Sequence, residues 1–192
     1  MAIDGGLTHM SAKRNGFSLI EVLVSLVILT VGLIGIFNLH IVSKRGSFES
    51  FQQTQASYYA NDIINRMRLN PSVLTSYGSE TGVTYTGDSL TAPSKACSGA
   101  AICTPAELQL WDVYEWQSAF IGEAESDGGN NVGGLPAPNG CIYVEPSKVV
   151  VVMSWTGIRK SSGTETGYSD YVINCGDKNN KKRIFEIETA IF

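Results

Sequence analysis

Residues 16–42, which read GFSLIEVLVSLVILTVGLIGIFNLHIV, decide the fold. Glu21 is the only fully ionised side chain in this apolar run. A helix needs about 20 apolar residues to cross a bilayer, so the run is long enough to span a membrane. Lys13 and Arg14 precede the run. By the positive-inside rule, we expect a cytoplasmic N-terminus and export of everything that follows.

Two simpler interpretations of this run compete with a specialised anchor. A cleaved signal peptide fits the basic start, but it has a shorter apolar core and a small-residue cleavage site after it. Residues 43–45, Ser-Lys-Arg, instead indicate a helix that continues into water. A plain signal anchor stays open. Glu21 argues against it, because a carboxylate inside a spanning helix is costly and usually has a partner. In the alternative, Glu21 simply reaches up to the headgroups.

The helical pattern continues beyond the apolar run. Apolar side chains recur at steps of three to seven residues at Phe48, Phe51, Tyr58, Ile63 and Met67. This spacing predicts one apolar stripe along an amphipathic helix. Asn70-Pro71 predicts its end. One helix over residues 17–70 would be about 80 Å long. We therefore expect one half in the membrane or filament and the other half against a globular domain.

The remaining residues predict an α+β head. Thr104-Pro105-Ala106-Glu107 is a capping box with proline at the first helical position, and it predicts one extra short helix ending near Ile121. Residues 149–153 are apolar at every position and predict a central strand covered on one side by a helix. Residues 78–103 and 122–140 are rich in turn-forming residues and predict loops. Strand-like runs occur at 83–85, 141–144, 148–155, 168–175 and 183–191.

Composition excludes several classes of function. The net charge of −4 gives no electrostatic case for nucleic-acid binding. His9 and His40 are the only histidines, and both precede the expected head. This removes Ser-His-Asp and Cys-His catalysis and most metal chemistries from that domain. We therefore expect no enzyme, no catalytic residue, no metal and no cofactor.

The four cysteines follow the apolar run, at Cys97, Cys103, Cys141 and Cys175. None forms a CxxC pair, which disfavours zinc and thioredoxin-like sites. An even number in an exported domain favours two disulfides, and three pairings are possible. Pairing by proximity in the sequence gives Cys97–Cys103 and Cys141–Cys175. Free buried thiols are the alternative.

Other side chains that could carry chemistry have plainer interpretations. Asp112 and Glu115 lie three residues apart on the expected short helix, as paired carboxylates would, but such a pair is typical of a solvated surface. The acidic loop at 123–130 offers oxygen ligands without the spacing of an EF-hand. We expect the tryptophans to be core or interface residues. They are Trp111, Trp116 and Trp155.

The segment Gly16-Phe17-Ser18-Leu19-Ile20-Glu21, with its basic leader and apolar run, resembles the leader junction of type IV pilins and type II secretion pseudopilins. The resemblance implies cleavage after Gly16 by prepilin peptidase, followed by N-methylation of Phe17. It also implies that Glu21 forms a salt bridge in the filament with the Phe17 amine of a neighbouring subunit. Such a pair offsets part of the cost of burying each charge. The leader starts at Met1 or at Met10, and both readings stay open.

Features of the expected head narrow the resemblance. The sequence Leu110-Trp111-Asp112-Val113-Tyr114-Glu115-Trp116-Gln117 is similar to a helix of PilV-type minor pilins. Residues 31–35, Leu135-Pro136 with Gly140, and residues 153–155 are similar as well. The resemblance implies a type IV pilin fold, in which a long N-terminal helix packs on a C-terminal antiparallel β-sheet. The expected segments are a leader (1–16), a transmembrane or filament-core helix (17–42), its amphipathic half (43–70) and a periplasmic head (71–192).

The same resemblance implies a minor pilin that primes type IV pilus assembly and supports twitching motility and adhesion. Its expected partners are prepilin peptidase, other minor pilins, the major pilin, a tip adhesin and the inner-membrane assembly platform. It would lie in the inner membrane before assembly and in the surface pilus, at the tip, afterwards. A type II secretion minor pseudopilin is the alternative within this class, although such domains are usually shorter. A signal-anchored periplasmic binding protein is the alternative outside it.

Overall fold

The computed structural model describes residues 16–87, 90–161 and 167–191. The chain divides into two compact units, residues 1–44 and 45–192. Helix α1 spans Leu19–Leu69 and therefore contributes to both units. It ends one residue before Asn70-Pro71, which confirms the stop expected there.

In the first unit, α1 is an uninterrupted apolar helix. Every side chain from Leu19 to Lys44 is exposed. The helix passes through Gly32 and Gly35 without a break, and an added methyl group at either glycine would contact nothing within 4 Å. The hydroxyl of Ser25 donates to the carbonyl of Glu21, so this polar group is satisfied within the helix. The unit thus consists of apolar surface that its own chain does not cover.

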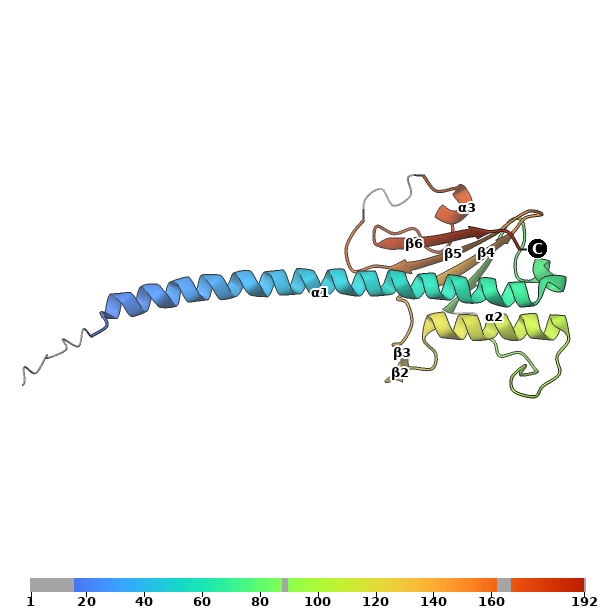
Figure 1. The fold of residues 1–192 in the computed structure, drawn as a ribbon, viewed down its shortest axis with the longest axis horizontal. Coiled ribbons are helices and arrows are strands. Elements are labelled where there is room, and N and C mark those ends of the chain that lie inside the picture. The colour runs from blue at the N-terminus through green and yellow to red at the C-terminus, as the bar shows by residue number, and fades with distance from the viewer. Residues whose placement is uncertain (1–15, 88–89, 162–166, 192) are drawn as a thin grey trace, which may run out of the picture. The chain divides into compact units, whose positions relative to one another are not determined.

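The second unit contains a four-stranded antiparallel sheet in the order β1-β4-β5-β6 (Figure 1). Its strands are β1 (Val83–Thr86), β4 (Asn139–Val144), β5 (Val149–Thr156) and β6 (Lys182–Thr189). Val151 of β5 pairs with Ile142 on one side and with Ile187 on the other. All of β5 except Thr156 is buried. The run of valines therefore forms the central strand, as its apolar pattern predicts.

Helix α2 (Pro105–Ile121) runs beside the head portion of α1, as Figure 1 shows. Thr104 and Glu107 form the expected capping box, since each side chain bonds to the backbone of the other. Gly122 ends the helix with a left-handed φ of 72°. A Cβ atom there would lie 2.1 Å from the backbone nitrogen of Gly134, so this turn requires glycine. The short 3₁₀ helix η1 (Pro71–Ser76) follows α1.

The main core lies between one face of the sheet and the two helices. The fully buried Trp116 of α2 packs edge-on against Tyr85 and Phe120. Its indole N–H donates to the carbonyl of Tyr59 in α1 at 2.8 Å. Trp155 is also buried, so the expectation of core tryptophans is confirmed for these two. Trp111 is half-buried on the surface of α2.

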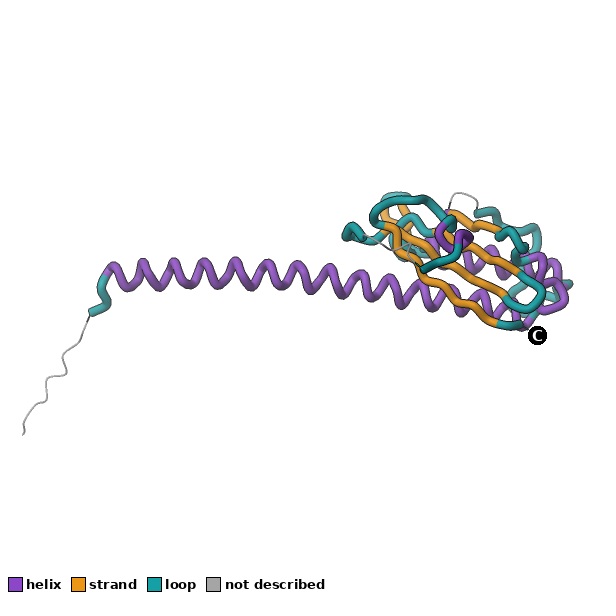
Figure 2. The backbone as a smooth tube through the Cα atoms, turned by 90° about the horizontal axis from the view of Figure 1, so that it is seen from above, coloured by secondary structure: helices purple, strands orange, loops and turns teal. Residues whose placement is uncertain are grey.

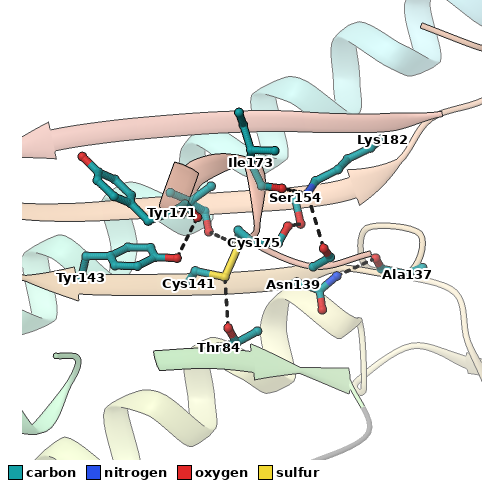
Figure 3. Close-up of a disulfide and its surroundings, with 12 residues drawn as sticks. Thr84, Ala137, Asn139, Cys141, Tyr143, Ser154, Tyr171, Ile173, Cys175 and Lys182 are labelled. Atoms are coloured by element: carbon teal, nitrogen blue, oxygen red, sulfur yellow. Dashed lines mark hydrogen bonds between the residues drawn. A yellow bond between two sulfur atoms is a disulfide. The ribbon is translucent and has the colours of Figure 1, made fainter. Parts of the chain in front are cut away.

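The opposite face of the sheet carries a second, smaller cluster. Cys175 is bonded to Cys141 of β4 and holds α3 (Asp170–Ile173) over this face (Figure 3). The hydroxyl of Tyr143 donates to the carbonyl of Tyr171 at 2.7 Å. The strand predicted over 168–175 is therefore wrong. Its apolar residues, Val172 among them, cover the sheet as a helical turn and loop instead of joining it.

The predicted apolar stripe on α1 is also wrong. Ile63 and Met67 are fully buried, whereas Phe51 and Tyr58 are 57% and 67% exposed. The face that packs into the core has another set of side chains, which includes small and polar residues. Its members are Gln52, Ala56, Tyr59, Ala60, Ile63, Ile64 and Met67. The head portion of α1 thus has two apolar faces, and only one of them is used within the chain.

The loops contain more structure than composition predicts. Residues 126–131 form a small hairpin of β2 (Ser126–Asp127) and β3 (Asn130–Asn131). Residues 78–103 contain the expected strand β1 and a disulfide between Cys97 and Cys103. The two disulfides join the first cysteine to the second and the third to the fourth, which is the pairing that proximity in the sequence predicts. None of the four cysteines is a free thiol.

Candidate functional site

The N-terminal end of the described chain presents the residues that the leader motif singles out. Gly16, Phe17 and Ser18 precede α1 as an exposed segment, and the Phe17 side chain is 83% exposed. The carbonyl of Ser18 accepts hydrogen bonds from the N–H groups of Glu21 and Val22, at 3.0 and 3.3 Å. These bonds close the first helical turn. They place Glu21 in that turn, four residues after Phe17.

Nothing in the packing of residues 16–87, 90–161 and 167–191 explains Gly16 or Glu21. An added side chain at Gly16 would contact nothing within 4 Å, so no close approach requires a glycine there. The Glu21 carboxylate is exposed and forms no ion pair with any residue that the structure describes. A carboxylate in an apolar helix is costly unless it is paired. Among the described residues, neither Gly16 nor Glu21 thus has a packing or ion-pair role.

The helix itself fits a membrane environment. It is the one described helix that is long and apolar enough to cross a bilayer, and none of its most apolar stretch is buried. A soluble core helix of this composition would bury most of its side chains. Exposed apolar surface of this length requires either lipid or other helices around it.

In the head, a polar network joins α1 to α2. Arg66 donates to Asp62 on its own helix, and to Asp112 and Glu115 on α2 at 3.2 and 2.7 Å. Burial alone would lower the pKa of Arg66, but the hydrogen bonds that it donates to Glu115 and Asp62 raise its pKa above the ordinary value. The guanidinium therefore stays charged and holds the two helices together.

Asp112 is the buried member of this network. Its carboxylate accepts from the hydroxyl of Tyr77 at 2.6 Å as well as from Arg66. Burial, with the bond to Asp112, raises the pKa of Tyr77 well above its ordinary value. Asn70 donates to the Tyr77 hydroxyl and to the carbonyl of Pro105. The expectation of a solvated carboxylate pair is thus wrong for Asp112, which instead ties the middle of α2 to Arg66 of α1 and to Tyr77.

A second ionic cluster fastens the other end of the head portion of α1. Arg159 donates its Nη2 to Glu49 at 2.7 Å, and Arg183 donates to the same carboxylate at 3.3 Å. The hydrogen bonds from Arg159 are the main reason that the pKa of Glu49 falls to about 2. Arg183 also donates to the carbonyl of Arg159, which ties the loop after β5 to β6.

The surface between α1 and α2 has an open cleft of about 490 Å³. Trp111 and Tyr114 line it with their rings tilted at 41° and centred 5.4 Å apart, beside Glu115 and Arg66. Over the described part of the chain, no three acidic, histidine or cysteine side chains gather as a metal site would require. The cleft offers an aromatic surface without a set of reacting groups.

Comparisons with known proteins fit this geometry. Residues 11–37 match the prokaryotic N-terminal methylation motif. Residues 40–114 match the family model of type IV pilin Tt1218. The chain is a type IV pilin. No curated protein and no solved structure matches the chain. The matched ranges include the apolar helix except residues 38–39 and reach into α2, while β4, β5 and β6 lie outside them.

Membership of this family explains the architecture of the chain and its processing. The α+β architecture, a long N-terminal helix packed on an antiparallel sheet, is the type IV pilin fold. Type IV pilins are structural subunits, not enzymes. The methylation motif implies that prepilin peptidase processes this pilin, and that it is anchored in the membrane before it joins other pilins in a pilus.

Sequence reasoning located the N-terminal residues of this site but missed the anchors of the head. Gly16, Phe17 and Glu21 lie together at the first turn of α1, and their individual roles stay predictions. The network of Arg66 and Asp112 went unnoticed because its partners are 46 residues apart, and no local pattern signals such a pair. The Glu49–Arg183 contact spans 134 residues and was missed for the same reason.

Proposed function

We propose that this pilin is a minor pilin that primes type IV pilus assembly, within a minor-pilin complex at the filament tip. The observation that carries the proposal is the exposed first turn of α1, where Phe17 and the unpaired Glu21 precede an uncovered apolar helix. Cleavage after Gly16 gives Phe17 a cationic amine, which prepilin peptidase methylates. That amine is the charge that Glu21 of an adjoining subunit needs in a low-dielectric bundle.

The minor-pilin assignment rests on the head. The PilV-like sequence over Leu110–Gln117 forms the centre of α2, where Trp116 enters the core and Asp112 bonds to Arg66. On the same helix, Trp111 and Tyr114 stay at the surface of the cleft. Trp116 and Asp112 thus fix one face of α2 against the head, and Trp111 and Tyr114 are available on its surface to contact other minor pilins. A tip role links the protein to twitching motility and adhesion.

The proposed topology follows from the processing step. Residues 1–16 are the leader, removed on the cytoplasmic side, and residues 17–42 span the inner membrane. Residues 43–192 form the amphipathic half of the helix and the periplasmic head. The two disulfides fit an oxidising compartment for the head. After assembly, the same apolar helix lies in the filament core.

Processing is tested by intact-mass measurement on protein from membranes with and without prepilin peptidase. We expect a chain that begins at N-methyl-Phe17 only when the peptidase is present. An unprocessed chain in both strains would contradict the proposal. Gly16→Val should behave as wild type does without the peptidase, because a branched side chain obstructs the site of cleavage. The matched control is Gly35→Val, a glycine in the same apolar helix that is also free of close contacts.

The role is tested by deleting the gene and counting surface pili. We expect a loss of pili and of twitching, restored by the wild-type chain, with this pilin far below the major pilin in sheared filaments. Normal piliation in the deletion strain, together with a loss of protein secretion, would point to a type II secretion pseudopilin instead.

A further inference from the structure

The sheet of the head has an open edge at β6. Just after β5, the backbone N–H of Gly157 donates to the carbonyl of Lys181, on the β6 side. The backbone N–H of Thr156 donates to the carbonyl of Pro136, on the opposite side of β5. In an antiparallel ladder, the backbone groups of successive residues point to opposite sides of the strand. With this register, the β6 residues whose backbone groups bond to β5 are Arg183, Phe185, Ile187 and Thr189. The N–H and C=O groups of Ile184, Glu186 and Glu188 therefore point away from the sheet. In Figure 2 the strand that leads to the C-terminal end lies on the outside of the sheet.

These outward groups have no partner in the described chain. No hydrogen bond from residues 16–87, 90–161 or 167–191 reaches the backbone of Ile184, Glu186 or Glu188. The strand is eight residues long and contains neither proline nor glycine. Proteins usually protect such edges with a short strand, a bulge or a proline, because an open ladder pairs readily with another strand.

Of the two carboxylates on this edge, only one forms an ion pair with a residue that the structure describes. Glu188 pairs with Lys148 at 3.1 Å, but Glu186 pairs with no cation that the structure describes. Burial raises the pKa of Glu186, and repulsion from Glu188 raises it further. A Lys or Arg directly opposite Glu186 on an added strand would offset both effects, since opposite charges across a ladder attract.

The other edge of the sheet is built differently. Strand β1 has four residues, and its outward carbonyl at Thr86 already accepts from the side chain of Gln117. It also carries no basic residue, since it reads Val-Thr-Tyr-Thr. A second copy of this chain cannot therefore place a cation from its β1 against Glu186. In β6 of a second copy, Lys182 also has an outward backbone position, but its side chain is buried and donates to the carbonyls of Ile173 and Gly176. A cation for Glu186 is therefore better supplied by a strand of a different subunit.

We propose that the outer edge of β6 binds an extended strand of another pilin subunit, with a Lys or Arg of that strand opposite Glu186. Backbone bonds to Ile184, Glu186 and Glu188 extend the sheet into the neighbour, and the charge pair sets the register. The strand-to-strand contact joins two heads in addition to the contacts between their helices. This inference rests on the proposed function, because it names one of the subunits' contact surfaces.

The edge can be blocked without touching the ladder of the head. Glu186→Pro removes an N–H that points outward and leaves every bond between β5 and β6 in place. Thr84→Pro is the matched control, since Thr84 of β1 has the corresponding outward position on the other edge. Glu186→Lys keeps the N–H and reverses the charge, so it tests the same contact without a backbone change.

The readout is photo-crosslinking in living cells. A benzoylphenylalanine in place of Glu188 of the full-length chain is irradiated, and the crosslinked peptide is mapped by mass spectrometry. We expect a strand of a sibling pilin with a basic residue near the crosslink. Glu186→Pro and Glu186→Lys should each reduce the yield about tenfold, and Thr84→Pro should leave it unchanged. Tryptophan fluorescence of the purified variants checks that each head is folded.

Several results would overturn the inference. They are a wild-type yield in Glu186→Pro or Glu186→Lys, a crosslink to a second copy of this chain, and a crosslink to a helix instead of a strand. Failure of the wider proposal looks different, because piliation would then be normal in the deletion strain. If the wild-type chain restores pili to that strain and both Glu186 variants restore them equally well, only the β6 contact is wrong.

Discussion

The apolar helix over residues 19–44 and the head over residues 45–191 treat their hydrophobic surface in opposite ways. No side chain from Leu19 to Lys44 is buried. In the head, Trp116, Phe120 and Met153 are inaccessible to solvent, and the surrounding core closes on itself. The difference teaches that the apolar helix has no core of its own, whereas the core of the head is closed by its own chain. Substitutions in the helix should therefore impair assembly, and those in the core of the head should impair stability.

The largest expected effect is on assembly, through Glu21. We expect Glu21→Ala to be cleaved and methylated normally but to enter pili at least about tenfold less, because the amine of its neighbour is left unpaired. Immunoblotting of sheared pili against membranes measures the ratio. Ser25→Ala, four residues further along the same helix, is the control and should assemble normally. Wild-type incorporation of Glu21→Ala would remove the distinction between helix and head.

The next effect concerns stability of the head alone. Replacing both Cys141 and Cys175 by Ser should lower the free energy of unfolding by about 3–4 kcal/mol, because this disulfide closes the longer loop. The matched control is the double replacement of Cys97 and Cys103, which should cost about 2 kcal/mol. Urea titration of full-length protein in detergent is followed by tryptophan fluorescence, which reports the head because all three tryptophans lie there. Equal losses would show that loop length is not the deciding factor.

A smaller loss is expected from the network between α1 and α2. Asp112→Ala should destabilise the head by about 2–3 kcal/mol, because Tyr77 and Arg66 lose a buried acceptor. Asp112→Asn keeps an acceptor oxygen and should cost about half as much. The same urea titration measures both variants. If Asp112→Asn is as damaging as Asp112→Ala, the charge matters more than the hydrogen bonds.

The smallest effect is a pH dependence from Glu49. Its pKa is about 2 in the folded head and 4.5 as the ordinary value. The stabilisation is thus fully present above pH 4.5, and it is lost as the pH falls toward about 2. We expect this group to account for about 1–2 kcal/mol over that range, reduced by solvent at Arg159. Glu49→Gln should unfold with a flatter acid profile, and an unchanged slope would show that Glu49 does not contribute.

The sequence predicts those parts of the fold that depend on local patterns. The end of α1 at Leu69, the capping box of Thr104 and the central position of β5 follow from proline, side-chain caps and continuous burial. The stripe on α1 was misjudged because the helix is apolar on two faces, and spacing alone does not say which face meets the sheet. Tyr171 and Val172 look strand-like, but the Cys141–Cys175 bond decides where they pack.

In the candidate site, too, local patterns are predictable from the sequence and long-range contacts are not. Gly16, Phe17 and Glu21 are close in sequence, so a motif identifies them as a group. The ionic anchors of the head join residues far apart in the chain, and their positions emerge only when the helices pack. The open edge of β6 is a property of strand order, which no segment of the sequence carries alone.

The Cys141–Cys175 bond has a consequence for timing. It ties the cover of one sheet face to β4, and it cannot form among the reduced thiols of the cytoplasm. A head on the wrong side of the membrane therefore lacks its strongest covalent clamp. In the proposed topology, this bond can therefore close only after the head has crossed the membrane, so that a subunit acquires its full rigidity in the periplasm.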